Sequence, residues 1–227
     1  MLLGKGIMIN WNNVAPEHRA AYDAWHCGEH MVGRLTIPGF LRGRRYIAVD
    51  ARRNFLTLYE VVDLEVLTGA DYLAKANSPS PLTLRTTPVV RDSIRGLSRV
   101  RASLGPGTGG FALTLRFDPQ PGGDDALEHY LAQQALPQIA QRADIVGAHL
   151  IVADKTASAM TPVERQGRPT EIPNWIVLIE GLTLAAVNNA GAAALTDALL
   201  VANGCATSIE RDTYALQFTL ASMRKLS

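Results

Sequence analysis

Histidines are concentrated in one short segment of the chain. Three of the five histidines lie between residues 17 and 35, where the spacing of apolar residues predicts a helix. A step of about 100° per residue gathers imidazoles, aromatic rings and a carboxylate on one helix face: His18, Tyr22, Trp25, His26 and Glu29, with His30 at its margin. The opposite face is small or apolar and is expected to pack on a sheet: Ala20, Ala24, Cys27, Gly28 and Met31.

The polar and aromatic face could perform proton transfer. Imidazole has an ordinary pKa of about 6.5, and a carboxylate beside it can orient the ring. We therefore predict that His26 and His30 act as acid and base and that Glu29 orients one of them. Tyr22 and Trp25 would form an apolar wall for a ring-bearing ligand. The alternative is a solvated helix face with a Glu–His pair worth about 0.2–0.5 kcal/mol.

The same histidines also fit a metal-binding motif. His26-Cys27-Gly28-Glu29-His30 matches the H-x-x-E-H pattern of inverted zinc peptidases, and two histidines four residues apart on a helix can bind one metal ion. Such peptidases need a third ligand and a larger scaffold, and the sequence offers no obvious third ligand. A metal site is therefore the minor alternative, and we predict no metal ion and no cofactor.

Arginines are frequent on the two predicted strands that would form the edges of the first sheet: Arg42, Arg44 and Arg45 on one, and Arg91, Arg95, Arg99 and Arg101 on the other. Charged side chains commonly protect edge strands from aggregation, and this is the favoured interpretation. The alternative is that one of these arginines binds a carboxylate-bearing ligand, which suits the planar guanidinium fork.

The elements that position these residues follow one order twice. Residues 1–104 predict βαββαβ, with a strand at 6–11, a helix at 17–35, strands at 40–49 and 54–62, a helix at 64–76 and a strand at 92–103. The same order returns at 111–117, 124–142, 145–153, 174–182, 184–201 and 207–220. The Gly-rich residues 105–109 form a linker. Residues 105–110 match G-x-G-x-x-G, but a strand follows where a dinucleotide site needs a helix.

An internal repeat is the economical interpretation of this order. We predict an α+β protein of two tandem ferredoxin-like βαββαβ units, residues 1–104 and 110–227, packed sheet to sheet as an intrachain dimeric α/β barrel. The first unit carries the candidate site, because the helix at 124–142 has no matching group of histidines. Residues 155–173 form a long excursion between two strands, either a lid or a surface loop.

Composition limits the environment and the partners of the chain. With 47% hydrophobic and 19% charged residues, 227 residues can bury an ordinary core. A net charge of +1 gives no overall attraction for nucleic acid or an anionic membrane. Two cysteines and the lack of a leader-like start favour the cytoplasm. The most apolar stretch, 181–206, is interrupted by polar residues and is not expected to span a membrane.

Motifs in the first half resemble those of a known superfamily. They are Trp25-His26-Cys27-Gly28-Glu29-His30, the turn Pro38-Gly39-Phe40, and Tyr59-Glu60. They are similar to motifs of the dimeric α/β-barrel superfamily and, more narrowly, of EthD-like proteins with a W-x-x-x-EH helix, a PGF turn and a YE-type strand. The resemblance implies ferredoxin-like halves that close into a barrel, a pocket between sheet and helices, and His30 as the carried-over site residue.

The superfamily includes muconolactone-type isomerases, cofactor-independent monooxygenases of aromatic polyketides and haem-binding enzymes. We therefore predict a cofactor-independent enzyme of isomerase, lyase or hydrolase type that acts by His-based proton transfer on a small, partly hydrophobic ring compound. The alternatives are a cofactor-independent monooxygenase of an aromatic substrate and a non-catalytic ligand-binding protein. A small aromatic or cyclic ligand is the expected partner, and a homodimer is left open. The predicted substrate-binding residues are Tyr22, Trp25, Arg45, Tyr46 and Tyr59.

Overall fold

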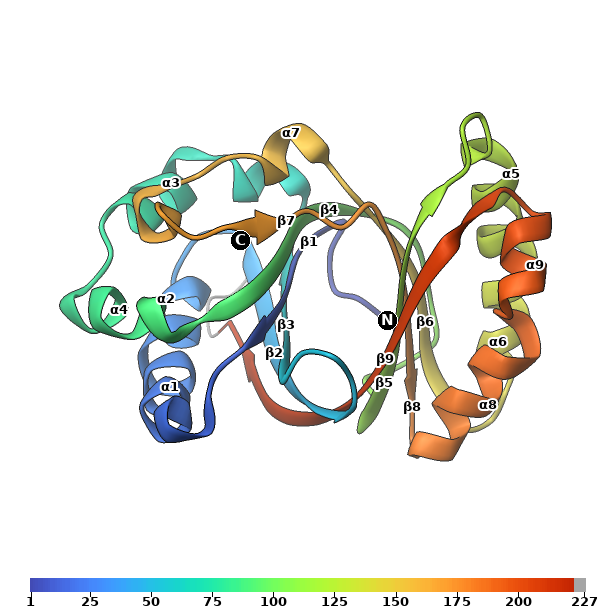
Figure 1. The fold of residues 1–227 in the computed structure, drawn as a ribbon, viewed down its shortest axis with the longest axis horizontal. Coiled ribbons are helices and arrows are strands. Elements are labelled where there is room, and N and C mark those ends of the chain that lie inside the picture. Colours follow the sequence, from blue (N-terminus) through green and yellow to red (C-terminus); the bar gives the residue numbers. More distant parts are fainter. Residues whose placement is uncertain (223–227) are drawn as a thin grey trace.

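The computed structural model describes residues 1–222 and forms a closed barrel with helices outside it (Figure 1). The first half contains β1 (Gly6–Asn13), α1 (Arg19–Trp25), α2 (Met31–Leu35), β2 (Phe40–Asp50), β3 (Phe55–Val61), α3 (Ala70–Asn77), α4 (Pro81–Thr86) and β4 (Arg91–Leu104). The second half contains β5 (Phe111–Pro119), α5 (Asp124–Tyr130), α6 (Leu136–Ala140), β6 (Ile145–Ala153), α7 (Lys155–Ser158), β7 (Thr170–Glu171), β8 (Trp175–Gly181), α8 (Leu184–Ala194), α9 (Asp197–Ala202) and β9 (Cys205–Ala221).

Eight strands close the barrel in the order β1-β3-β2-β9-β5-β8-β6-β4, and β4 returns to pair with β1. Every neighbouring pair in this ring is antiparallel. The two halves join at both edges, β2 on β9 and β4 on β6, so their sheets face each other across one interior. The predicted fold class is confirmed. The division into two repeat units stays a prediction, and residues 223–227 of the second unit lie outside the described residues.

Closure of the barrel changes the meaning of the arginine-rich strands. A closed barrel has no free edge to protect, and β2 and β4 are each hydrogen-bonded on both sides. Arg44, Arg45 and Arg95 are buried, with 2% or less of their surface exposed. Edge protection is therefore the wrong explanation for these residues, because charges that guard an edge must face water.

The barrel interior combines an apolar core with a charged network. Its apolar part includes Ile7, Ile9, Trp11, Leu56, Leu58, Ile151 and Leu178. Within it, Arg44 pairs with Glu60, at 2.8 Å between Nε and Oε1, and with Glu180. His149 Nε2 lies 3.2 Å from Glu180 Oε2. These charges are tolerated inside the barrel because each has an opposite partner or a hydrogen bond.

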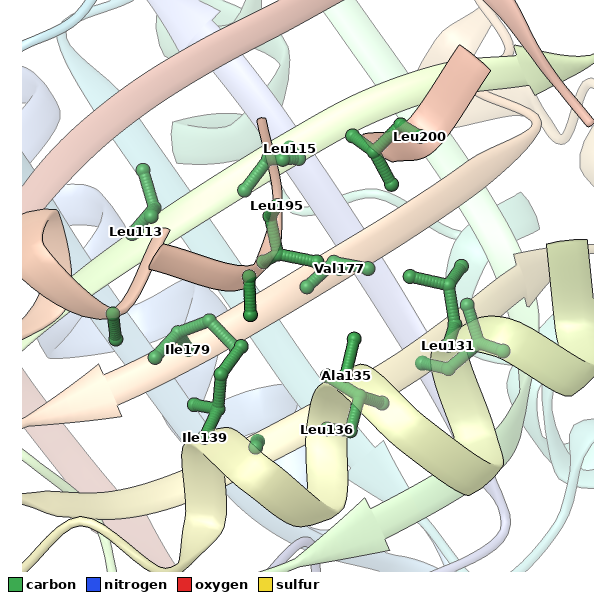
Figure 2. Close-up of a cluster of buried hydrophobic side chains, with 14 of the residues drawn as sticks. Leu113, Leu115, Leu131, Ala135, Leu136, Ile139, Val177, Ile179, Leu195 and Leu200 are labelled. Atoms are coloured by element: carbon green, nitrogen blue, oxygen red, sulfur yellow. The ribbon is translucent and has the colours of Figure 1, made fainter. Parts of the chain in front are cut away.

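The helices lie on opposite outer sides of the barrel, α1 to α4 with the short α7 on one side and α5, α6, α8 and α9 on the other (Figure 1). In the second half they pack directly on the sheet through aliphatic side chains (Figure 2). Leu131, Leu136 and Ile139 of the helix meet Val177 and Ile179 of β8 there. Burying each such side chain contributes about 1.5–3 kcal/mol. No helix among residues 1–222 is long and apolar enough to cross a membrane.

Local capping explains where the helices differ from the sequence prediction. The segment 78–88, expected as a connection, contains α4, because Ser80 accepts a hydrogen bond from the Thr83 amide and Pro81 occupies the first turn. The helix expected at 184–201 divides into α8 and α9, because Thr196 caps the start of α9 by accepting from the Leu199 amide. The PGF turn places Gly39 at φ +87°, a conformation that favours glycine.

The predicted excursion at 155–173, hereafter the strap, leaves the second half and covers the first. It connects the adjacent strands β6 and β8 and runs beside α3 (gold and orange in Figure 1). The Val163 amide donates to Asn77 Oδ1 at 3.0 Å, and β7 pairs with the first part of β4 at Ser93 and Ile94. The strap is therefore ordered against the helices and sheet of the first half.

Candidate functional site

The histidine-bearing helix contains a widened turn at the predicted site. α1, a π-helical turn at His26–His30 and α2 form one continuous helix from Arg19 to Leu35. Such turns are frequent at functional sites. The second half has the same feature at Leu131–Ala135. The π turn is therefore common to both halves and does not identify the site by itself.

The helix buries its aromatic and imidazole face. Tyr22, Trp25 and His26 are each 5% exposed or less, while Ala20, Ala24 and Gly28 are exposed. The expectation that the small-residue face packs on the sheet is therefore wrong, apart from Met31, which is buried. The large rings remove more apolar surface from water than alanine or glycine could, and this difference favours the observed orientation.

A cavity of about 70 Å³ lies between this face, the outer side of the sheet and the strap. This space holds only a few water molecules. Its walls come from the helix, from β1, β3 and β4, and from the strap, and they include Asn12, Tyr22, Trp25, His26, His30, Arg34, Thr57, Tyr59, Arg95, Glu164, Arg165 and Arg168. The structure thus brings five of the eight predicted site residues to one cavity, which are Tyr22, Trp25, His26, His30 and, from β3, Tyr59.

His26 is the most enclosed of the histidines on this helix. Its ring stacks on Tyr22 at 5.4 Å between centroids and lies 5.7 Å from the His30 ring. Its Nδ1 is buried and has no hydrogen-bond partner among residues 1–222. Burial, and then the positive charge of Arg45, lowers the pKa of His26 to about 3. The ring is therefore neutral at pH 7 and can take part in a hydrogen bond. The low pKa makes it a weak base in the free chain, and a negative charge formed beside the ring would raise that pKa.

His30 lies beside Trp25, with ring centroids 4.5 Å apart, and is partly exposed. Burial, followed by Arg34 and His26, holds the pKa of His30 well below its usual range. Neither histidine is protonated at neutral pH. The division into one acid and one base stays a prediction, and in the free chain neither ring carries a proton to donate.

Glu29 occupies a different place from the one expected. Its Oε1 accepts hydrogen bonds from the hydroxyls of Ser80 and Thr83 at the start of α4, and no hydrogen bond joins it to His26 or His30. It lines a neighbouring depression between the helix and α4, which shares His30, Arg34 and Glu164 with the cavity, and does not line the cavity itself. The predicted orienting role is therefore not supported. Glu29 instead ties two helices together.

Arg45 and Tyr46 lie outside the cavity. Arg45 pairs with Asp23 and stacks on Phe55, with its guanidinium carbon 4.1 Å from the ring centroid. Tyr46, next along β2, faces the barrel interior, where its hydroxyl lies 3.0 Å from Glu180 Oε1. Successive residues of a strand point to opposite faces, so the two side chains could not both reach one pocket. Arg45 supports the aromatic wall from behind.

Comparison with solved structures identifies the fold. An anthrone oxidase-like protein superposes with a TM-score of 0.68 and 15% identity, over 98% of this chain and 94% of that one. A candidate monooxygenase from Fusobacterium nucleatum superposes with a TM-score of 0.63 and 9% identity, over 97% and 96%. The chain has the dimeric α/β-barrel fold. No family model matches the sequence, no curated protein matches it, and the EthD-like resemblance is not confirmed.

Haem does not fit within the cavity itself. A haem-binding protein from Thermus thermophilus shares the fold, with a TM-score of 0.54 and 10% identity over 94% of this chain and 91% of that one. In the first half the cavity holds about 70 Å³, whereas drug-sized ligands need about 300–1,000 Å³. In the second half the matching space is filled by the aliphatic core of Figure 2, and His129 is exposed.

Sequence reasoning missed the charged wall of the cavity. Arg34 follows His30 by one helical turn, and this i,i+4 spacing was a usable signal. Glu164, Arg165 and Arg168 reach the site only through the strap, far along the chain. Asn12, on β1, accepts a hydrogen bond from the Tyr22 hydroxyl at 3.2 Å and fixes that ring. Only the folded chain shows that these residues belong to one site.

Proposed function

We propose that the chain is an enzyme that removes a proton from a small, partly hydrophobic ring compound and lets the resulting anion react with molecular oxygen. The carrying observation is His26, a buried neutral imidazole that lines the cavity and whose Nδ1 has no partner among residues 1–222. A buried ring nitrogen left unpaired is costly unless a ligand or water uses it, and in the tautomer with the proton on Nε2 this nitrogen is an acceptor. This supports His26 as the base.

The aromatic walls support a ring-bearing substrate. The Tyr22 ring stacks on His26, with centroids 5.4 Å apart, and the Trp25 ring lies beside His30, with centroids 4.5 Å apart. Apolar aromatic walls with a few polar groups are typical of small-molecule sites. A proton acceptor enclosed by such walls is shielded from water, which favours transfer from the bound molecule over transfer from solvent.

The oxygen step is supported by the structural neighbours and by the chemistry of the anion. Loss of a proton from an activated ring methylene leaves an electron-rich carbanion, which can pass an electron to O2 and recombine as a hydroperoxide. Loss of water then leaves a carbonyl, so that CH2 and O2 become C=O and H2O. Proteins named as an anthrone oxidase-like protein and as a candidate monooxygenase share the fold. Isomerisation or elimination would begin with the same proton removal.

An open depression beside the cavity provides room for a substrate that is larger than the cavity itself. An open depression of about 780 Å³, the vestibule, adjoins it and shares Val90, Ser93 and Arg168 with its wall. The reacting edge of a ring can enter beside His26 while the remaining atoms lie in the vestibule, between the start of β4 and strap residues 167–171.

The test measures oxygen uptake and proton exchange separately. Anthrone, and the smaller indan-2-one with the same kind of acidic methylene, are given to the full chain under air, and under nitrogen in D2O. We expect O2 uptake above the uncatalysed rate, an oxygen atom from ¹⁸O2 in the product carbonyl, and deuterium exchange without O2. His26→Asn should lower kcat/KM by about 10²–10⁴-fold. His129→Asn, at an exposed position in the second half, is the matched control and should leave kcat/KM unchanged.

Two other results would contradict the proposal in different ways. Proton exchange with no oxygen uptake would place the reaction in the isomerase or lyase class. Binding with neither exchange nor uptake would favour a non-catalytic ligand-binding protein.

A further inference from the structure

The cavity carries more positive charge than its own residues neutralise. Its lining includes the guanidinium groups of Arg34, Arg95, Arg165 and Arg168 but only one carboxylate, that of Glu164. Arg34 forms an ion pair with Glu164, and both side chains are less than 10% exposed. Among residues 1–222, no carboxylate forms an ion pair with any of the other three arginines.

The three unpaired arginines have only neutral hydrogen-bond partners. Arg95, which is 2% exposed, donates to the Tyr72 hydroxyl at 2.9 Å. Arg165 donates to Thr170 Oγ1 at 2.7 Å, and Arg168 donates to the backbone carbonyl of Glu164. Burial, followed by repulsion from Arg95 and Arg168, lowers the pKa of Arg165 to about 9. Enclosed guanidinium groups without a counterion are unfavourable, so the arrangement favours an anion from outside the chain.

The unpaired atoms of the cavity wall show what this partner must provide. Nε of Arg168 and Nδ2 of Asn12 are buried donors with no acceptor among residues 1–222. Asn12 is 5% exposed and its Oδ1 already accepts from Tyr22, so the free group of its side chain is the donor. Vacant donors next to unbalanced positive charge call for a compact, negatively charged acceptor.

We infer that the cavity binds a carboxylate group carried by the ring substrate, held by Arg95, Arg165 and Arg168 on the side formed by β4 and the strap. A carboxylate matches the planar guanidinium fork and, with three heavy atoms, fits a narrow cavity. The inference rests on the proposed function for the ring and the reaction, but the binding step can be measured without turnover. The substrates are therefore ring compounds with an acidic C–H or O–H and a permanent carboxylate.

Binding of the carboxylate would also fix the strap. Two of the three arginines belong to the strap and the third to β4. One carboxylate held by both elements joins them across the mouth of the cavity, since Arg168 also lines the vestibule. Binding should therefore protect the strap from trypsin, which cleaves after arginine.

The test compares ligands of one shape and different charge on the full chain. Benzoate is the probe, benzamide is its neutral isostere and phenyl phosphate is the alternative anion. Binding is measured by calorimetry, together with trypsin cleavage after Arg165, because the Arg168–Pro169 bond resists trypsin. We expect benzoate to bind at least about tenfold more tightly than benzamide, as a charge-assisted hydrogen bond should give, and to slow cleavage. Arg165→Gln should weaken benzoate about 10–100-fold and leave benzamide unchanged.

Matched variants separate binding from structure. Arg85→Gln, at an exposed position on α4, is the control and should alter neither ligand. Arg168→Gln provides a second measurement if Arg165→Gln does not fold. Equal binding of benzoate and benzamide, or an Arg165→Gln protein with unchanged preference for benzoate, would overturn the inference, and stronger binding of phenyl phosphate would replace carboxylate by phosphate. Oxygen uptake without carboxylate preference would overturn only this inference, whereas carboxylate preference without uptake would overturn only the proposed function.

Discussion

The ion pair between Arg34 and Glu164 should decide whether the strap stays closed. Arg34 is on the helix, Glu164 is on the strap, and their side chains are 4% and 9% exposed. Removing one partner of a buried pair typically costs about 3–5 kcal/mol, because the other charge stays buried without compensation. Glu164→Gln keeps the shape of the side chain and removes the only carboxylate that lines the cavity among the described residues. Its cost should therefore approach the lower end of that range.

The strap should open locally, because global unfolding would cost more. None of residues 163–168 of the strap is buried, and Val163 is 42% exposed, so little apolar packing opposes the release of this segment. A loss of about 3 kcal/mol raises the opening equilibrium roughly 100-fold. Hydrogen exchange of residues 160–170 should therefore accelerate by about that factor in Glu164→Gln, with a much smaller fall in Tm.

A matched exposed pair is the control for this measurement. Arg99 and Glu65 form an ion pair with side chains 48% and 64% exposed, and such pairs contribute little. Glu65→Gln should therefore leave strap exchange unchanged. Replacing both Arg34 and Glu164 with methionine should restore slow exchange, since an apolar pair removes the uncompensated charge. Strap exchange in Glu164→Gln as slow as in the unaltered chain would refute the reasoning.

Two further predictions concern pH. The pKa of His26 is lowered to about 3, below its unfolded value of about 6.5, so only the unfolded chain binds this proton at intermediate pH. This group should lower the free energy of unfolding by up to about 1.4 kcal/mol per pH unit below pH 6.5. In His26→Asn, the free energy of unfolding measured with urea should therefore change less between pH 7 and pH 5. Burial alone would raise the pKa of Glu180, but Arg44 and His149 lower it to about 2. Its stabilisation should be present above about pH 4.5 and lost as the pH falls toward 2, and Glu180→Gln should lack this acid loss in circular dichroism titrations; an unchanged acid limb would contradict the assignment.

The barrel was predictable because its signals are local and repeated. Strands with apolar alternation, such as 54–62, and helices bounded by turn residues follow from spacing along the chain. The orientation of the first helix was not predicted correctly, because its small residues were expected to face the sheet. Tyr22 and Trp25 bury more apolar area than Ala20 and Ala24 could, and that difference outweighs the closer approach that alanines allow.

The charged part of the site could not be predicted from spacing alone. Arg34 and Glu164 are 130 positions apart, and the strap that brings them together has no regular periodicity. For Glu29, closeness in sequence was misleading. Its position beside His26 and His30 suggested that its carboxylate would orient one of these rings. Its carboxylate instead accepts hydrogen bonds from the hydroxyls of Ser80 and Thr83, which take the place of the histidines as donors. Proximity in sequence gave a candidate, and the tertiary hydrogen bonds decided its role.

The two halves show how one frame can hold either a core or a site. The π turn of the second half begins at Leu131 and ends at Ala135, both buried against the aliphatic core (Figure 2). The π turn of the first half begins at His26 and ends at His30, and a cavity takes the place of that core. Polar groups at such positions forgo apolar packing and leave donors and acceptors unpaired. The strap covers the first half, where the cavity replaces part of the core. A ligand bound there can supply hydrogen-bond partners to the unpaired polar atoms of the wall.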